Sequence, residues 1–253
     1  MRKKIVAGNW KMNKNVIEAQ QLMLQLLDYK KRNPTNCEVW IAPPALYLLM
    51  AKDLFALNEI GIFSQDMSEH ESGAYTGEIS AEMLESIGAT GSIIGHSERR
   101  QYHGETDSHC NAKIKLALEK GLTPIYCNGE TLEQRKSGKH LEVVKNQTEV
   151  ALFTLNAEEI TKVVIAYEPV WAIGTGETAS PEQAQEIHAH IRSLIAEKYG
   201  KEVADEISIL YGGSVKPDNA QEIFSQPDID GGLIGGAALK IEDFSKIIEA
   251  FNA

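Results

Sequence analysis

Short apolar runs alternate with longer amphipathic segments along the whole chain. Eight of these runs have the length and β-rich composition of strands, and some, such as Val163–Ala166, are apolar at every position. Continuous apolar runs are typical of parallel strands that are covered on both faces. The predicted strands are Ile5–Trp10, Glu38–Ala42, Gly61–Ser64, Ser92–Ile94, Thr123–Cys127, Val163–Tyr167, Ile207–Tyr211 and Gly232–Ile234.

The amphipathic segments between these runs predict helices, among them Val16–Tyr29, Thr106–Lys120 and Ile241–Phe251. The clearest start signal is Ser180-Pro181-Glu182, which supplies an N-cap, a proline at the first helical position and an acidic first turn. This helix is expected to run to Tyr199, just before Gly200.

Strict alternation of eight strand–helix pairs predicts the α/β class with an all-parallel sheet. Eight is the number that closes a (β/α)8 barrel ringed by helices, and α/β barrels commonly use about 250 residues as one domain. An open doubly wound sheet is the alternative that periodicity leaves open. Because no Pro/Gly/Ser-rich linker divides the chain, residues 1–253 are expected to form a single catalytic domain.

Composition narrows the possible partners. The formal net charge is −11, which argues against nucleic acid or an anionic membrane as a partner. No apolar run approaches the roughly 20 residues that cross a bilayer, and the basic N-terminus is followed by too short an apolar run for a signal peptide. The cysteines Cys37, Cys110 and Cys127 are odd in number and widely spaced, which predicts a reduced, cytoplasmic setting.

Unusual residues follow the strands, where a barrel places its chemistry. Asn9 and Lys11 come after the first strand, and an ammonium group there can attract a phosphorylated substrate, although a plain surface lysine is the simpler interpretation. His96 ends the fourth strand, directly before a possible helix start at Ser97. A helix N-terminus favours the neutral imidazole, which can donate to a substrate oxygen. The alternative for a lone histidine is a structural hydrogen bond.

The sixth strand ends in Glu168, a carboxylate that partial desolvation would make a stronger base. An apolar segment bounded by Pro169 and by Gly174 and Gly176 comes next. Such a segment in a loop predicts a lid that closes over the substrate and expels water. A structural carboxylate followed by a packed loop is the alternative.

Two glycine pairs follow the seventh and eighth strands, in Tyr211-Gly212-Gly213-Ser214 and in Gly235-Gly236-Ala237. Glycines allow the backbone N–H groups to approach a phosphate closely. We therefore expect a phosphate site built from Gly174, Ser214, Gly235 and Gly236. In the resulting mechanism Glu168 abstracts a proton beside a carbonyl, and His96, Lys11 and Asn9 stabilise the enediolate oxygen.

Four motifs in this order resemble the triosephosphate isomerase family over essentially the whole chain. They are Gly8-Asn9-Trp10-Lys11, Gly95-His96-Ser97-Glu98-Arg99-Arg100, the segment from Ala166-Tyr167-Glu168-Pro169 to Gly174-Thr175-Gly176, and Tyr211-Gly212-Gly213-Ser214-Val215. The resemblance implies a TIM barrel that interconverts dihydroxyacetone phosphate and glyceraldehyde 3-phosphate in glycolysis and gluconeogenesis, with no cofactor and no metal. General accounts of this barrel and of its acid/base pair are themselves based on this family.

The resemblance also implies roles for individual residues. Glu168 matches the base, His96 the neutral electrophile, Lys11 and Asn9 the substrate contacts, Gly174 the phosphate-binding lid residue, and Ser214, Gly235 and Gly236 the rest of the phosphate site. Glu98 fits a supporting carboxylate. The family is dimeric, and the segment around Tyr75-Thr76 resembles the loop that reaches into the partner subunit.

The sequence departs from the family pattern at Asp66, Asn128 and Ala238, where asparagine, an aliphatic residue and serine are expected. Asp66 adds a negative charge near the site or the interface. Two other classes of protein remain as alternatives, namely another sugar-phosphate barrel enzyme and a non-catalytic phosphate-binding barrel. A Schiff-base aldolase is disfavoured because Lys162, the only lysine in the predicted strand regions, lies at the wrong end of its strand, and a metal-dependent epimerase lacks ligand clusters.

Overall fold

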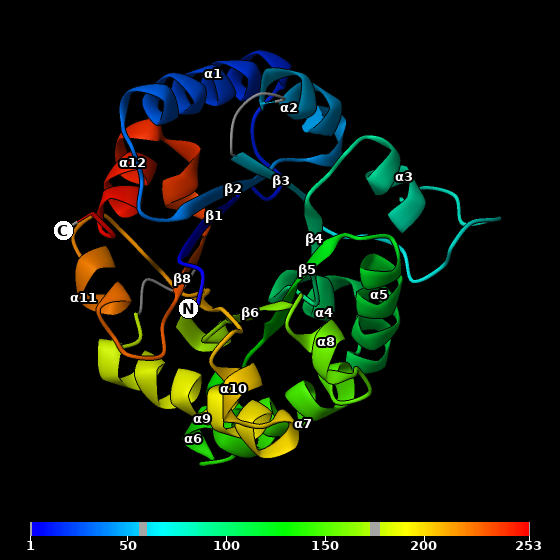
Figure 1. Ribbon diagram of the computed structural model, residues 1–253, viewed down its shortest axis with the longest axis vertical. Helices are drawn as coiled ribbons and strands as arrows, with labels where there is room; N and C mark the ends of the chain where they lie inside the picture. The colour runs from blue at the N-terminus through cyan, green and yellow to red at the C-terminus, as the bar shows by residue number, and fades with distance from the viewer. Residues whose placement is uncertain (1, 56–59, 173–177, 253) are drawn as a thin grey trace.

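The computed structural model describes residues 2–55, 60–172 and 178–252, and its eight strands close into a parallel barrel ringed by helices (Figure 1). Each strand pairs with the next along the chain, and β8 returns to β1 with Ile5 opposite Gly231. The predicted barrel is therefore confirmed. The strands are β1 Ile5–Asn9, β2 Glu38–Ala42, β3 Ile60–Ser64, β4 Gly91–Ile94, β5 Thr123–Asn128, β6 Val164–Tyr167, β7 Ile209–Tyr211 and β8 Gly231–Ile234.

Alternate strand residues contribute their side chains to two separate apolar cores, because successive side chains point to opposite faces of a strand. One apolar cluster consists of strand residues only and fills the barrel interior, with Ile5, Phe63 and Leu210 among its members. The other includes neighbours such as Val6 and packs against the surrounding helices. This double burial explains why some strand runs are apolar at every position.

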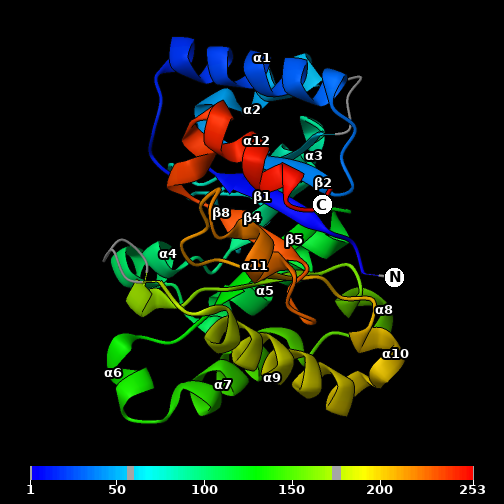
Figure 2. The same ribbon diagram turned by 90° about the vertical axis from the view of Figure 1, so that its left-hand side faces the viewer.

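Twelve α-helices within the described residues surround the barrel (Figures 1 and 2). They are α1 Val16–Arg32, α2 Leu48–Phe55, α3 Ala81–Ser86, α4 Ser97–His103, α5 Asp107–Glu119, α6 Leu132–Lys136, α7 His140–Leu152, α8 Ala157–Ile160, α9 Pro181–Tyr199, α10 Lys201–Ala204, α11 Ala220–Phe224 and α12 Ile241–Glu249. Short 3-10 helices, η1 Ala45–Tyr47, η2 Val170–Ala172 and η3 Gly236–Leu239, add to them. No helix among these residues is long and apolar enough to cross a membrane.

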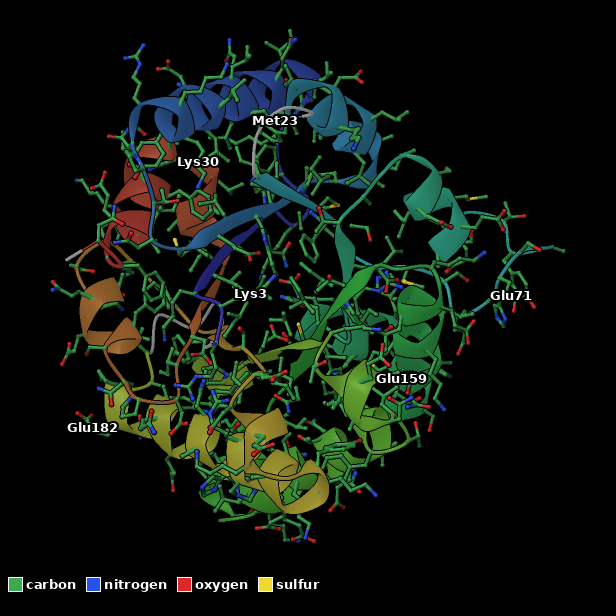
Figure 3. All side chains as sticks on the ribbon, in the orientation of Figure 1. Lys3, Met23, Lys30, Glu71, Glu159 and Glu182 are labelled. Atoms are coloured by element: carbon green, nitrogen blue, oxygen red, sulfur yellow. The ribbon has the colours of Figure 1, made fainter. Side chains whose placement is uncertain are left out.

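Local sequence signals account for several helix ends. The hydroxyl of Ser180 accepts from the N–H of Gln183, with Pro181 at the helix start, so α9 begins and ends as predicted. Helix α1 runs three residues further than expected, to Arg32, because a basic last turn suits a helix C-terminus. Its apolar face, including Met23, turns toward the barrel (Figure 3).

The seventh strand differs from the prediction, since it begins at Ile209 and not at Ile207. The carbonyl of Ile207 accepts a hydrogen bond from the Arg192 guanidinium at 3.0 Å, so it does not take part in strand pairing. All eight strands point the same way, and their carboxyl ends therefore meet at one end of the barrel. In Figure 2 this is the end near α4 and α6, whereas α8 and α10 lie at the amino end.

Candidate active site

A cavity of about 770 Å³ opens at the carboxyl end of the barrel. The structure brings seven of the sequence-predicted site residues together around it: Asn9, Lys11, His96, Glu168, Ser214, Gly235 and Gly236. The eighth, Gly174, lies outside the described residues. These residues lie at or just after the carboxyl ends of different strands, so the barrel itself assembles the site.

The carboxylate of Glu168 is almost completely buried and is held by groups at the start of α4. Its Oε2 accepts from the Ser97 N–H at 2.8 Å, and its Oε1 accepts from the Ser97 hydroxyl at 3.1 Å. The same Oε1 lies 3.1 Å from Nε2 of His96. The carboxylate is therefore held by hydrogen bonds from Ser97 and His96 and not by a salt bridge to a lysine or arginine. A bound substrate can replace such hydrogen bonds.

His96 is the N-cap of α4, which begins at Ser97 as predicted. Its Nδ1 accepts the N–H of Glu98 at 3.2 Å, so this nitrogen carries no proton. A neutral ring then carries its proton on Nε2, the atom that faces Glu168 and the cavity. The geometry supplies an N–H donor beside the Glu168 carboxylate, at the wall of the cavity.

Lys11 occupies a backbone conformation that few side chains adopt, with φ of 51°. Two amides hold this turn, since the Asn9 side chain accepts the Lys11 N–H at 3.0 Å and the Gln65 side chain donates to the Lys11 carbonyl at 2.9 Å. The ammonium group lies 2.6 Å from Glu98. The lysine is therefore a fixed part of the cavity wall rather than a freely solvated surface residue.

Two glycines allow the backbone to approach Glu168. A β-carbon at Gly129 would lie 1.7 Å from the Glu168 carbonyl oxygen, and one at Gly212 would lie 2.9 Å from the Glu168 Cγ. Neither position can accept a side chain without moving the strand end. The short helix η3 also lines the cavity and begins at Gly236, and the first N–H groups of a helix have no acceptor within it.

Glu130 is a functional candidate that the sequence analysis missed. It is fully buried, and its Oε1 accepts from the Tyr167 hydroxyl at 3.0 Å and from the Trp171 indole at 2.8 Å. Burial, with Glu130 beside it, raises the pKa of Tyr167 well above 10.0, so the hydroxyl remains a donor. Glu130 thus anchors the start of the predicted lid. Its place just after a strand was the signal available in the sequence.

The extra charge of Asp66 is offset within the fold. Its two carboxylate oxygens pair with Lys113 at 2.7 Å and with Arg99 at 2.8 Å. Burial still raises the pKa of Asp66, although Lys113 opposes this. The other two departures, Asn128 and Ala238, are both buried; the Asn128 amide donates to Thr148 at 3.1 Å.

No cluster of three or more His, Cys, Asp or Glu side chains suited to a metal occurs in residues 2–55, 60–172 and 178–252. The predicted absence of a metal and of a cofactor stays a prediction. His188 and His190, two apart on α9, point in different directions: the first is fully buried and contacts the carbonyl of Asp228, whereas the second reaches the carbonyl of Leu141.

Comparison with known proteins finds similarity over nearly the whole chain. The sequence model of a family described as Triosephosphate isomerase matches residues 4–251. Triosephosphate isomerases of Bacteroides fragilis and Phocaeicola vulgatus are 57% and 56% identical over 252 residues, covering 100% of both chains in each case. That of Flavobacterium johnsoniae is 53% identical over 250 residues, covering 99% of this chain and 100% of its own. The similarity extends far beyond the motifs that line the cavity.

Proposed function

The chain belongs to the triosephosphate isomerase family, as its motifs predicted, and on that premise we propose how its cavity performs the reaction. The protein is an enzyme that interconverts dihydroxyacetone phosphate and D-glyceraldehyde 3-phosphate, a reaction of glycolysis and gluconeogenesis. The observation that carries the assignment of roles is the Glu168 carboxylate, buried 3.1 Å from Nε2 of His96 in a cavity that also contains Lys11.

Glu168 is the base. It removes a proton from the substrate carbon beside the carbonyl, and the electron pair moves to the carbonyl oxygen to give an enediolate. The Nε2 proton of His96 and the ammonium of Lys11 stabilise that oxygen, with Asn9 beside them. His96 then moves a proton between the two oxygens, and protonated Glu168 returns its proton to the neighbouring carbon. The reaction is an internal redox exchange that needs no external oxidant.

The phosphate group binds to backbone N–H groups near Ser214, Gly235 and Gly236, and to Gly174 of the lid segment. Binding through neutral N–H groups suits a chain with a net charge of −11, because it adds no formal charge of its own. Lid closure expels water and protects the enediolate from side reactions.

The test is isomerisation of glyceraldehyde 3-phosphate by purified wild type and by Glu168→Gln, with Glu182→Gln on the exposed first turn of α9 as the matched control. We expect kcat of Glu168→Gln to fall about 10³-fold, the scale of a lost general base, and the control to match wild type. A folded wild type without turnover would remove the proposal. Equal rates in all three proteins would point to a different base.

We further propose a homodimer that forms through the loop around Tyr75-Thr76. This loop projects away from the barrel between β3 and α3, and Glu71 lies on the projection (Figures 1 and 3). Large apolar side chains are also exposed in the segments that follow β1 and β2 at the same end, with Met12 96% and Leu46 86% accessible. Exposed apolar groups of this size favour burial against a second copy.

Sedimentation equilibrium tests the dimer. A carboxylate in place of Tyr75 would be desolvated in the interface, so Tyr75→Glu is expected to shift the mass from dimer to monomer at micromolar concentration. Glu78→Gln, in the same exposed loop, serves as the control. A monomeric wild type, or a Tyr75→Glu variant that remains fully dimeric, would contradict the proposed interface.

We also propose that residues 1–253 act as one catalytic domain in the cytoplasm, without a nucleic-acid or membrane partner. Helix α12 packs against α1, which supports a ring of helices belonging to one unit. The free thiols of Cys37, Cys110 and Cys127 suit a reducing compartment.

A further inference from the structure

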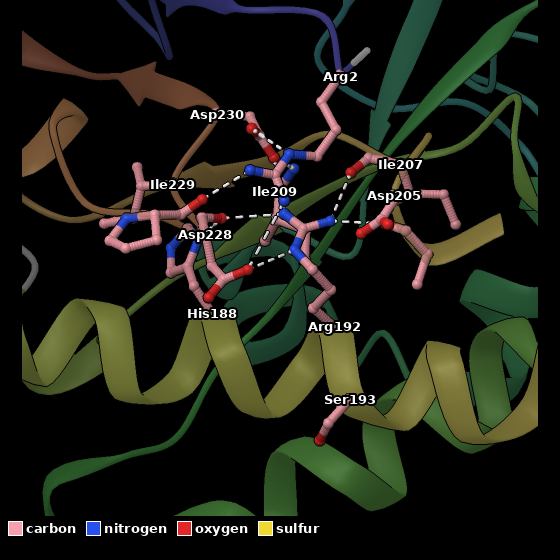
Figure 4. A network of polar contacts seen from close by, with 12 residues as sticks. Arg2, His188, Arg192, Ser193, Asp205, Ile207, Ile209, Asp228, Ile229 and Asp230 are labelled. Atoms are coloured by element: carbon pink, nitrogen blue, oxygen red, sulfur yellow. Dashed lines mark hydrogen bonds and ion pairs between the residues drawn. The ribbon is translucent and has the colours of Figure 1, made fainter. Parts of the chain in front are cut away.

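His188 is a fully buried histidine on α9 that the proposed mechanism does not use (Figure 4). Its Nδ1 lies 3.3 Å from the carbonyl oxygen of Asp228. A carbonyl only accepts, so Nδ1 carries the ring proton. Burial lowers the pKa of His188 to about 3, which keeps the ring neutral. Among the described residues Nε2 has no hydrogen-bond partner, so the ring is hydrogen-bonded through Nδ1 alone.

The hydrogen bond of His188 is one of several that connect one face of α9 to the segment before β8. Gln185, His188 and Arg192 lie on one face of the helix, and all three hold Asp228. The Gln185 amide donates to the carboxylate at 2.7 Å and the Arg192 guanidinium at 2.6 Å. Arg192 also reaches the buried Asp230 at 2.8 Å (Figure 4). The helix position is thus set firmly on this side.

The rest of the ring packs against two tyrosines at the carboxyl ends of β6 and β7. Tyr167 meets it edge to face, with ring centroids 5.8 Å apart, and Tyr211 is tilted at 6.3 Å. Tyr167 directly precedes Glu168, and Tyr211 directly precedes Gly212, which lies against the Glu168 side chain. His188 therefore fills the space behind both strand ends that position the base.

We propose that His188 is a positioning residue for the isomerase reaction, whose ring sets the spacing between α9 and the ends of β6 and β7 and so holds Glu168 in place. The inference rests on the proposed function. Ring packing carries the effect, because the Asp228 carbonyl keeps a second donor in Arg192 at 3.1 Å if the Nδ1–H is lost. Loss of the ring lets Tyr167 relax toward α9, and a displacement of about 1 Å can cost about 10²-fold in rate.

Two variants separate the ring from the hydrogen bond. His188→Asn keeps an N–H near the place of Nδ1 and removes the ring, whereas His188→Phe keeps a ring and removes the N–H. We expect His188→Asn to lower kcat about tenfold with KM nearly unchanged, while His188→Phe stays within about twofold of wild type. The primary deuterium isotope effect on kcat should rise in His188→Asn, because proton abstraction becomes slower than the other steps.

His190→Asn is the matched control, on the same helix but bonded to Leu141, and should leave kcat and the isotope effect unchanged. An unchanged kcat in His188→Asn, or a loss that follows only the folded fraction with the same isotope effect, overturns the inference. If His188→Asn does not fold, His188→Phe decides: near-full kcat supports the role of the ring, and a tenfold loss overturns it. A wild type without turnover would instead contradict the proposed function.

Discussion

Two buried carboxylates at opposite ends of the barrel, Asp230 and Glu168, are satisfied in different ways. At the amino end Asp230 is fully buried and pairs with three cations, Arg2 at 3.0 Å, Lys4 at 3.1 Å and Arg192 at 2.8 Å. At the carboxyl end the described donors to Glu168 are the backbone N–H and hydroxyl of Ser97 and the ring of His96.

The difference follows from what each carboxylate has to do. A buried ion pair is costly to break, because loss of one partner leaves an uncompensated charge in a medium of low dielectric constant. Hydrogen bonds from neutral groups can be exchanged one for one with a substrate. Lys11, a cation that lines the site, pairs with the partly exposed Glu98 and not with the base. The contacts of Asp230 should therefore govern stability, and those of Glu168 should govern rate.

The largest effect is expected at the carboxyl end. Lys11→Met removes the cation that stabilises the enediolate oxygen, and kcat/KM should fall about 10²- to 10³-fold, the scale of one lost oxyanion donor. Because Glu98 is 42% exposed, losing its partner should change the free energy of unfolding little. Steady-state kinetics and urea unfolding measure the two quantities. A loss of stability with unchanged kinetics would make Lys11 structural.

Arg192→Met should show the opposite pattern. It removes a cation from Asp228 and Asp230 together, and the free energy of unfolding should fall by about 3 kcal/mol. The folded variant should keep far more of kcat than Lys11→Met does. Arg32→Met, which breaks an exposed pair with Asp28 on α1, is the control and should unfold like wild type. A stable Arg192→Met variant would erase the contrast between the two ends.

The third expected effect concerns pH. Burial lowers the pKa of His188 from 6.5 to about 3, so between these values the unfolded chain binds a proton that the folded chain does not. The stability contributed is complete above pH 6.5 and is lost as the pH falls toward 3. The slope reaches at most about 1.4 kcal/mol per pH unit. Urea unfolding of wild type and His188→Phe across this range should show a shallower slope in the variant; equal slopes would refute the assignment.

Most of the fold could be predicted because it depends on local patterns. Apolar runs place the strands, and the cap at Ser180 places α9. The start of β7 could not be predicted, since the carbonyl of Ile207 is taken by Arg192 from another element. Propensity and periodicity carry no information about such a long-range competitor for a backbone group.

In the candidate site, too, local patterns identify some residues, whereas contacts between distant residues could not be predicted. His96 and Glu168 could be found because each is a polar residue at the end of an apolar strand. The hydrogen bonds between Ser97 and Glu168 and between Trp171 and Glu130 could not be predicted, because they join residues 71 and 41 positions apart in the sequence. The ion pair by which Lys113 offsets the charge of Asp66 likewise joins residues that are distant in the sequence.

The left-handed backbone at Lys11 has a consequence for selection. For an L-residue this conformation costs roughly 1–2 kcal/mol relative to glycine, so a glycine substitution, which also removes the ammonium group, offers an easy gain in stability at this position. A library screened for heat resistance alone should accumulate glycine at position 11 and yield robust but inactive barrels. Retention of lysine there would report that a population has been screened for turnover.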